Sequence, residues 1–140
     1  MRVLKWLGIA LVAYVGLVVA FECLVGFMGK RQAETGAVSD ARWIVISTSD
    51  SGGSRDTVIA GVDLDGQLYV AANHWPRGWY QRAIANPDVE VTRGGEKKPY
   101  RAVPLTGDDE AQVAGKYVLP FAIRFLTGFP PRSFLRLDPR

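Results

Sequence analysis

Few residues in this chain are of the types that carry out chemistry by themselves. The chain has one histidine, His74, and one cysteine, Cys23, which lies inside an apolar segment. This pair cannot assemble a multi-histidine or cysteine-rich metal site, a disulfide or a Cys-His dyad. His74 remains as a candidate for proton transfer, since the ordinary pKa of histidine is about 6.5. A structural or exposed histidine is the alternative.

Two segments combine glycine with arginine, which suits them to binding an anion. The first, 48–55, contains Gly52 and ends at Arg55, and the second, 74–78, contains Arg77. A guanidinium can hold a phosphate through two parallel hydrogen bonds, and a glycine-rich backbone can present N–H groups to it. A solvated hairpin loop is the alternative for the first segment.

The charge distribution argues against binding to nucleic acid. The chain has 17 basic and 14 acidic side chains, a formal net charge of +3. After residue 30 the balance is 14 basic against 13 acidic residues. A nucleic-acid-binding domain needs a concentrated basic face, which this balance does not provide.

These residues lie among predicted strands and short helices. Strands rich in β-branched residues are expected over 43–48, 56–62 and 67–72, the last two joined by an Asp-Gly turn. A short helix over 79–85 ends before Asn86-Pro87, because the residue before proline avoids helical geometry. The segments 49–54 and 74–78 are expected to be loops.

The second half continues with a hairpin and one or two helices. Strands are expected over 88–93 and 98–104, a helix from about 106 to 118, a second helical piece over 121–127, and a last strand over 133–137. Thr106 or Asp108 can cap the first helix. This order predicts an α+β fold, a small and mostly antiparallel β-barrel with one or two packed helices.

An apolar segment precedes this domain. Residues 6–21 have no charged side chain, and the apolar character continues to Met28 with only Glu22 interrupting it. A helix from Leu4 to Met28 is long enough to cross the roughly 30 Å hydrocarbon core of a bilayer. We expect a single-pass anchor over 1–30, a linker over 31–41 and the domain over 42–140. A cleaved signal peptide is the alternative.

The charges flanking the segment leave its orientation open. Arg2 and Lys5 on one side stand against Lys30, Arg31 and Arg42 on the other, which is close to a tie under the positive-inside rule. A second apolar region near the C-terminus, with Phe121, Phe125 and Phe129 among arginines, is expected to be core and rim, or a face that leans on lipid.

The stretch 79–91 resembles a known family. It reads Trp-Tyr-Gln-Arg-Ala-Ile-Ala-Asn-Pro-Asp-Val-Glu-Val, and it is similar to the deazaflavin (F420)-dependent nitroreductases and quinone reductases. These proteins have a split β-barrel related to the flavin-binding pyridoxamine-phosphate oxidases. The family pattern is a Trp-Tyr pair followed by Ala-Asn-Pro-x-Val-x-Val. The likeness extends over roughly 42–140.

The resemblance implies a cofactor site and a catalytic neighbourhood. The cofactor is F420, and His74 and Tyr117 are the catalytic candidates, with Tyr117 carried over by region alone. The implied partners are a lipophilic small-molecule acceptor and the lipid bilayer, with homodimer formation left open. The implied cofactor-binding residues are Gly52, Arg55, Thr57, Ala72, Asn73, Arg77, Trp79 and Tyr80.

The first loop departs from the family pattern. Where the family has an Arg-Lys pair for the cofactor's phosphate and polyglutamate tail, this chain has Ser49 and Asp50. At an effective dielectric near 20, one unit charge about 4 Å from another is worth about 4 kcal/mol, so a reversed charge at Asp50 weakens anion binding. The family's Asn-Leu is also replaced, by Arg82-Ala83.

The sequence therefore predicts a membrane-anchored oxidoreductase, located at the cell membrane with its domain in the cytoplasm. It would pass a hydride from reduced F420 to a quinone or nitro-type acceptor. Two alternatives stay open. One is a non-enzymatic, membrane-tethered binding module that has lost the phosphate clamp, and the other is a variant that binds FMN or haem.

Overall fold

The computed structural model describes residues 2–35, 42–72 and 78–140. Within these residues, a long N-terminal helix is followed by six strands and three shorter helices. The strands are β1 (Trp43–Asp50), β2 (Gly53–Leu64), β3 (Gln67–Ala72), β4 (Asp88–Arg93), β5 (Glu96–Pro104) and β6 (Ser133–Pro139). The helices are α1 (Arg2–Thr35), α2 (Gly78–Ala85), α3 (Gly107–Lys116) and α4 (Phe121–Leu126).

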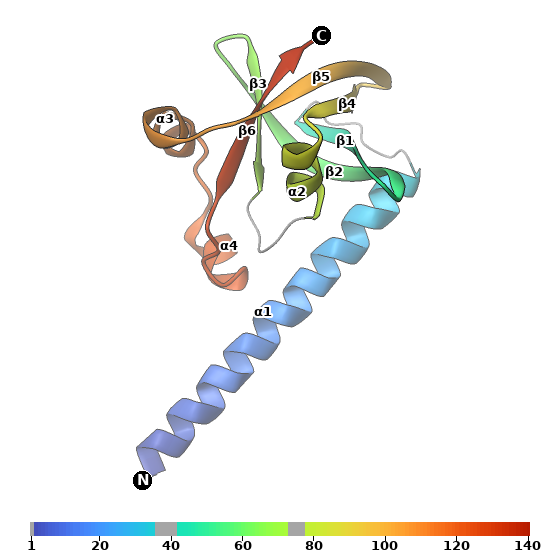
Figure 1. Ribbon diagram of the computed structural model, residues 1–140. Coiled ribbons are helices and arrows are strands. Elements are labelled where there is room, and N and C mark those ends of the chain that lie inside the picture. The colour runs from blue at the N-terminus through green and yellow to red at the C-terminus, as the bar shows by residue number, and fades with distance from the viewer. Residues whose placement is uncertain (1, 36–41, 73–77) are drawn as a thin grey trace.

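The strands form a closed barrel in the order β1-β2-β3-β6-β5-β4. Every neighbouring pair is antiparallel, and the C-terminal strand β6 closes the barrel by pairing with both β3 and β5. Figure 1 shows the strands curling around one another, with the C-terminus at the far end from α1. The predicted α+β fold with a small antiparallel barrel is confirmed.

Alternation along the strands creates the barrel core. On β1, Ile44, Ile46 and Thr48 are fully buried, as the period of two requires for a strand with one face inward. Ile44 and Ile46 pack with inward residues of the other five strands and with Trp79 and Ala83 of α2. Helix α2 therefore contributes to the same core as the strands.

Helix α3 packs on the outside of the barrel. Val113 of α3, Tyr117 just after it and Phe134 of β6 belong to a second cluster of buried residues, with Ala71 and Leu105. The two helices thus lie on different parts of the barrel, as Figure 1 shows. Thr106 occupies the N-cap position of α3, but its side chain makes no capping hydrogen bond.

Most predicted elements occur close to their expected positions, with one clear error. The short helix is confirmed within one residue. The hairpin after Asn86-Pro87 is also confirmed; it turns at Gly94-Gly95, and its second strand begins at Glu96, two residues earlier than expected. The predicted loop over 49–54 is wrong. Strands β1 and β2 stay paired through Asp50 and Gly53, so only Ser51 and Gly52 form the turn.

Helix α1 extends away from the barrel and is exposed along most of its length (Figure 1). Its segment Val3–Met28 has a mean hydropathy of 2.3 and is long and apolar enough to cross a membrane. The helix continues to Thr35, into the range expected as a linker. The rest of that linker lies outside the described residues.

Candidate functional site

A surface pocket of about 500 Å³ opens between the β1–β2 turn and α2. It lies at the end of the barrel where α2 enters the core. Its lining comes from two segments far apart in sequence, and most of the surface facing the pocket is contributed by the carbon atoms of these residues: Ser49, Asp50, Ser51, Gln81, Arg82, Ala85 and Asn86.

Arg82 is the cation of this pocket. Its Nε donates a hydrogen bond of 3.0 Å to Oγ1 of Thr48, a residue with no exposed surface. The other N–H donors of Arg82 have no partner among the described residues. The buried threonine thus fixes the guanidinium while leaving donors for an anion.

Gly78, at the start of α2, provides the space for this arginine. A Cβ at this position would lie 3.0 Å from Nη1 of Arg82, closer than side chains normally approach. The absence of a side chain at Gly78 therefore allows the guanidinium to lie against the first turn of the helix.

The β1–β2 turn holds an acidic side chain beside the pocket. Oδ1 of Asp50 accepts a hydrogen bond of 2.7 Å from the backbone N–H of Gly52, a local turn that aspartate commonly makes. The carboxylate is thereby engaged with the turn, and Gly52 does not offer its N–H to a ligand. Backbone capture of an anion by a glycine-rich loop, one way to compensate for the lost cations, is therefore weakened here.

The strand register brings two further predicted residues to the same face. Arg55 pairs with Thr48, and Thr57 pairs with Ile46. Directly opposed residues of an antiparallel pair point to the same side of the sheet, so Arg55 and Thr57 share the side that carries Thr48. Arg55 is exposed at the end of that row, where it adds a second cation near the mouth of the barrel.

Three more predicted cofactor residues are described. Trp79 is buried in the barrel core, and its ring meets the half-buried ring of Tyr80 edge-to-face at 5.8 Å. Ala72 is the buried last residue of β3, paired with Ser133 of β6. Trp79 and Tyr80 belong to the same helix as Arg82. Asn73, His74 and Arg77 lie outside the described residues.

Tyr117 lies in a different part of the molecule from this pocket. Its hydroxyl donates to the carbonyl oxygen of Ala60 at 2.9 Å, and its ring packs against Phe134 in the outer cluster beside α3. Burial raises the pKa of the Tyr117 hydroxyl above its ordinary value of 10.0. These contacts show a packing role, and its catalytic role stays a prediction.

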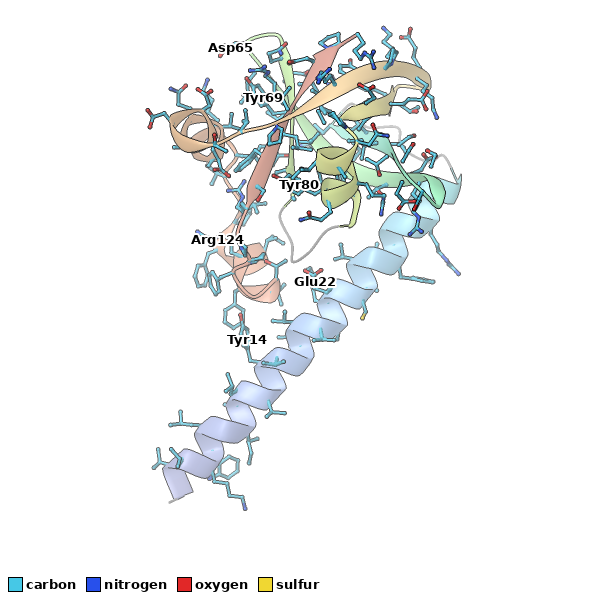
Figure 2. The ribbon with its side chains drawn as sticks, viewed as in Figure 1. Tyr14, Glu22, Asp65, Tyr69, Tyr80 and Arg124 are labelled. Atoms are coloured by element: carbon cyan, nitrogen blue, oxygen red, sulfur yellow. The ribbon has the colours of Figure 1, made fainter. Side chains whose placement is uncertain are left out.

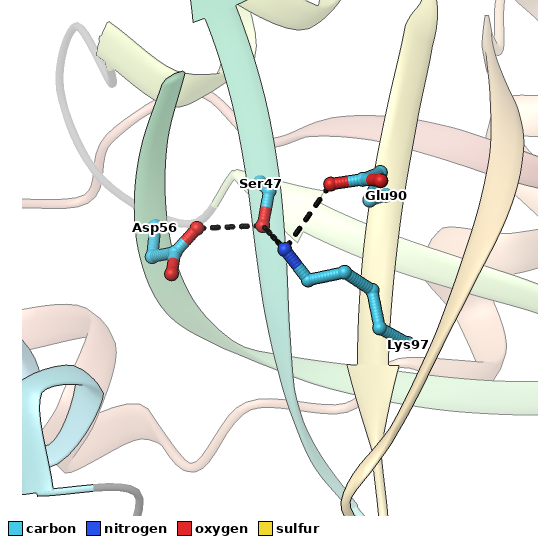
Figure 3. Close-up of polar contacts among 4 residues, drawn as sticks. All are labelled: Ser47, Asp56, Glu90 and Lys97. Atoms are coloured by element: carbon cyan, nitrogen blue, oxygen red, sulfur yellow. Dashed lines mark hydrogen bonds and ion pairs between the residues drawn. The ribbon is translucent and has the colours of Figure 1, made fainter.

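A polar row crosses four strands on the outer side of the barrel (Figure 3). The hydroxyl of Ser47 donates to Oδ1 of Asp56 at 2.6 Å, and Nζ of Lys97 lies 3.5 Å from Ser47 Oγ and 3.1 Å from Oε2 of Glu90. Ser47 is adjacent to Thr48 and points to the opposite face. The row ties β2, β1, β4 and β5 together.

Within the described residues, no group of three or more His, Cys, Asp or Glu side chains could hold a metal ion. The chemically useful feature of the pocket is its fixed cation, Arg82. Arg55 lies outside the pocket's lining, opposite Thr48 on β2, and the Trp79–Tyr80 pair lies on the same helix as Arg82.

The closed antiparallel barrel, with a short helix packed on it through Trp79 and Ala83, places the molecule among the split β-barrel proteins. The sequence profile of the F420H(2)-dependent quinone reductases matches residues 30–122. The chain belongs to this family, whose members are oxidoreductases, so the suspected relationship is confirmed. No sequence among the curated proteins matches the chain.

Solved structures support the same fold. An F420-H2 dependent reductase, FDR-A, is 22% identical with a TM-score of 0.57, over 72% of this chain and 97% of that one. A domain-swapped dimer is 20% identical with a TM-score of 0.58, over 84% and 95%. A putative pyridoxamine 5'-phosphate oxidase from Listeria innocua is 10% identical with a TM-score of 0.52, over 71% and 84%. At these identities the likeness establishes the fold alone.

Arg82 is the residue that the sequence did not single out for binding. It was visible only as a departure from the family's Asn-Leu pattern. Its position next to the equally unusual Asp50 depends on β1 and α2 meeting in the barrel, which no local pattern indicates.

Proposed function

We propose that this chain is a membrane-anchored oxidoreductase that transfers a hydride from reduced F420 to a quinone or another lipophilic acceptor. The observation that carries the proposal is the pocket at Arg82, in a chain whose family uses F420H(2). The acceptor class follows from the family's description as quinone reductases.

The residues of the pocket fit an anionic part of the cofactor. Arg82 is held by Thr48 and has space against Gly78, so it can bind a phosphate or carboxylate oxygen without rearranging. Arg55 stands on the same side of the sheet and adds a second positive charge. In this proposal the two arginines take over the task of the missing Arg-Lys pair.

When bound, the reduced deazaflavin supplies the hydride, and the protein positions it. The ring of Trp79 is buried in the barrel core, and the ring of Tyr80 packs against it. These contacts hold α2 on the barrel and so favour a fixed position for Arg82. His74 stays the proposed proton donor to the reduced acceptor, and Asn73 and Arg77 stay proposed cofactor contacts. For Gly52, Thr57 and Ala72, the proposed role is to shape the cofactor site.

Helix α1 is proposed as the membrane anchor, with the barrel on the cytoplasmic side where an F420-dependent enzyme finds its cofactor. Support comes from the length and hydropathy of Val3–Met28 and from its exposure, since none of the apolar window is buried within the protein. A homodimer also stays a proposal. It is suggested only by a structural neighbour described as a domain-swapped dimer.

A turnover assay tests the reaction. The purified full-length chain in detergent is mixed with chemically reduced F420 and a naphthoquinone, and reoxidation of F420 is followed by its absorbance. We expect oxidation faster than in the protein-free control and slower in Arg82→Gln. A wild-type rate equal to the protein-free rate, with several quinones, would contradict the proposed activity.

The alternative cofactors are tested by titration. The replacement of two family cations by Ser49 and Asp50 favours a ligand with less negative charge than F420, such as FMN or haem. The full-length chain is therefore titrated separately with the three ligands. Binding of FMN or haem without binding of F420 would select a variant cofactor. Binding of none at tens of micromolar would favour a non-enzymatic module.

The proposed topology has its own measurement. A C-terminal fusion to a reporter that is active only in the cytoplasm should be active in cells. Activity of a periplasm-specific reporter at the same position would contradict a cytoplasmic barrel.

A further inference from the structure

Helix α4 and the turns around it expose several large apolar side chains to solvent. No residue of α4 is buried. The large apolar residues of this segment that stand in the open, with their exposed fractions, are Val118 (80%), Phe121 (71%), Ile123 (37%), Phe125 (42%) and Phe129 (45%). We call these five residues the α4 patch. A contiguous patch of this kind indicates an interaction surface.

The aromatic members of the α4 patch contact one another. The ring of Phe121 lies 6.3 Å from that of Phe125 and 5.8 Å from that of Phe129, measured between centroids. Phe125 and Phe129 are 6.4 Å apart, edge-to-face. The three rings therefore form one apolar surface on the outside of the domain.

This surface continues directly onto α1. The ring of Tyr14 lies 4.9 Å from the ring of Phe125, and its hydroxyl donates a hydrogen bond of 2.9 Å to the Phe125 carbonyl oxygen. Figure 2 shows Tyr14 reaching from α1 toward α4. The partly covered residues of α1 share one face with Tyr14, at helical spacing: Val18, Phe21, Glu22 and Val25.

The contact occurs near the middle of the apolar segment. Val3–Met28 has 26 residues. At 1.5 Å per residue, Tyr14 lies about 16 Å from the Val3 end and about 21 Å from the Met28 end. The hydrocarbon core is only about 30 Å thick, so a helix that crosses it carries Tyr14 well below the interface. Phe125 must lie at a similar depth along the helix.

At the C-terminal end of α4, three backbone carbonyl groups accept hydrogen bonds from within the protein, as they must if this end lies in hydrocarbon. Exposed carbonyl groups at a helix end are costly in lipid unless they accept hydrogen bonds. The carbonyl of Ile123 accepts from the backbone N–H and the hydroxyl of Thr127. The Arg124 carbonyl accepts from the N–H of Phe129 and from the Thr127 hydroxyl, and the Phe125 carbonyl accepts from the Gly128 N–H and from Tyr14.

We propose that the α4 patch inserts into the hydrocarbon of the bilayer beside α1, so that the domain is seated on the membrane by two elements rather than tethered by one. This inference rests on the proposed role of α1 as the anchor. The occupant is lipid acyl chain, because the patch is apolar, continuous with the spanning segment and supplied with satisfied carbonyls. Arg124 extends from the same helix, and its guanidinium lies 5.7 Å from the Phe129 ring centre, where the aromatic face offers the charge a favourable contact.

Spin-label accessibility tests the insertion on the full-length chain in phosphatidylcholine liposomes. Cys23→Ser removes the native thiol, and single cysteines are then introduced for labelling. Phe121→Cys and Val118→Cys report on the patch, Leu11→Cys on α1, and Gln112→Cys on the exposed side of α3. Relaxation by oxygen, which concentrates in hydrocarbon, is compared with relaxation by a water-soluble nickel chelate.

We expect the labels at positions 121 and 118 to behave like the label at position 11, with oxygen collisions exceeding nickel collisions. The label at position 112 should show the reverse. Nickel access at 121 and 118 equal to that at 112, while 11 stays in lipid, would overturn the inference and leave the anchor intact. Shielding of 121 and 118 from both reagents would also overturn it, since a protein partner would then cover the patch. Nickel access at position 11 would overturn the anchor, and this inference with it.

Discussion

At the scale of single residues, the pocket depends on how one arginine is held. Arg82 has a buried partner, Thr48, on the strand side and an open approach at Gly78 on the helix side. A charge-assisted hydrogen bond to a buried hydroxyl fixes the guanidinium better than a solvated contact would. The proposed cation is therefore preorganised, which compensates in part for the unfavourable charge at Asp50.

Gly78→Ala tests whether the space beside Arg82 matters for cofactor binding separately from the stability of α2. The added Cβ would lie 3.0 Å from Nη1 of Arg82, so the end of this side chain would have to shift by a few tenths of an ångström. We expect F420 affinity to fall by about two-fold, while the free energy of unfolding stays the same or rises by up to about 1 kcal/mol, because alanine restricts the unfolded chain more than glycine does. Fluorescence titration and urea unfolding measure the two quantities. An unchanged affinity would contradict the role given to this space.

Tyr117→Phe tests the packing role of the buried hydroxyl. Removal of its hydrogen bond to Ala60 should lower the free energy of unfolding by about 0.5–1.5 kcal/mol at neutral pH. The pKa of Tyr117 is raised by burial, so its contribution is complete below the unfolded pKa and is lost as pH rises above 10.0.

The stability difference between wild type and Tyr117→Phe should therefore shrink above pH 10.0, as followed by urea unfolding across that range. F420-dependent turnover at pH 7 should change little if Tyr117 only packs. A large loss of turnover with unaltered stability would instead support the catalytic role that the resemblance suggested.

At the scale of elements, the barrel is closed by β6 between β3 and β5. Asp138 of β6 accepts from Gln67 of β3 at 2.8 Å, and its two oxygens accept from Arg136 at 2.7 and 3.0 Å. The hydrogen bond from Arg136 is the main reason that the pKa of Asp138 is below its ordinary 3.8. Through Gln67 and Asp138, this cluster joins β3 to the C-terminal strand β6.

Asp138→Asn tests how much this cluster contributes to the barrel. An aspartate with a lowered folded pKa stabilises the protein above its unfolded pKa and loses that contribution as pH falls below about 3.8. We expect wild type to be more stable than Asp138→Asn at pH 7, and the difference to shrink in acid. The effect should be small, because the pair is partly exposed. A difference that does not change with pH would contradict this account.

The strands and helices were predictable where the pattern of apolar residues agrees with turn-forming or helix-ending residues at the boundaries. The Asp-Gly turn before Gln67 and the break at Asn86-Pro87 specify local geometry directly, and both occur as expected. The segment 49–54 was mispredicted because its glycine- and serine-rich composition indicates a loop. Cross-strand pairing with β1 extends β2 through it, an interaction that composition does not report.

The candidate site was less predictable, because its contacts join distant parts of the chain. Arg82 meets Thr48 across 34 positions, and Tyr14 meets Phe125 across 111. The family resemblance indicated α2 and the β1–β2 turn as neighbours of the cofactor. It could not indicate that a non-family arginine on α2 would occupy the pocket.

At the scale of the whole molecule, α1 and α4 are the elements that, in the proposed arrangement, would set how the barrel sits relative to a membrane. The Tyr14–Phe125 contact is a link between them, and contacts between α1 and β2 add a second connection near the barrel. Two separated connections should hold a helix at a defined angle to the domain. The proposed enzyme would then present its pocket at a constant height above the bilayer.

Tyr14→Ala should loosen this arrangement. Loss of the ring contact and of the hydrogen bond to Phe125 removes one of the two connections. Distances between spin labels at Leu11→Cys and Gln112→Cys, in the Cys23→Ser background, should become more broadly distributed in Tyr14→Ala. Tyr14→Phe, which keeps the ring, should broaden them less. Equal distributions in all three proteins would contradict a fixed angle.

The most direct test of the central claim is the F420 affinity of the full-length chain and of two matched variants, measured by cofactor fluorescence. Arg82→Gln removes the pocket cation, and Arg101→Gln makes the same change at an exposed site on β5. Loss of a hydrogen bond to a charged group predicts binding about 10- to 100-fold weaker for Arg82→Gln. Arg101→Gln should match wild type. Equal affinity of Arg82→Gln and wild type, or no binding by wild type, would contradict the account.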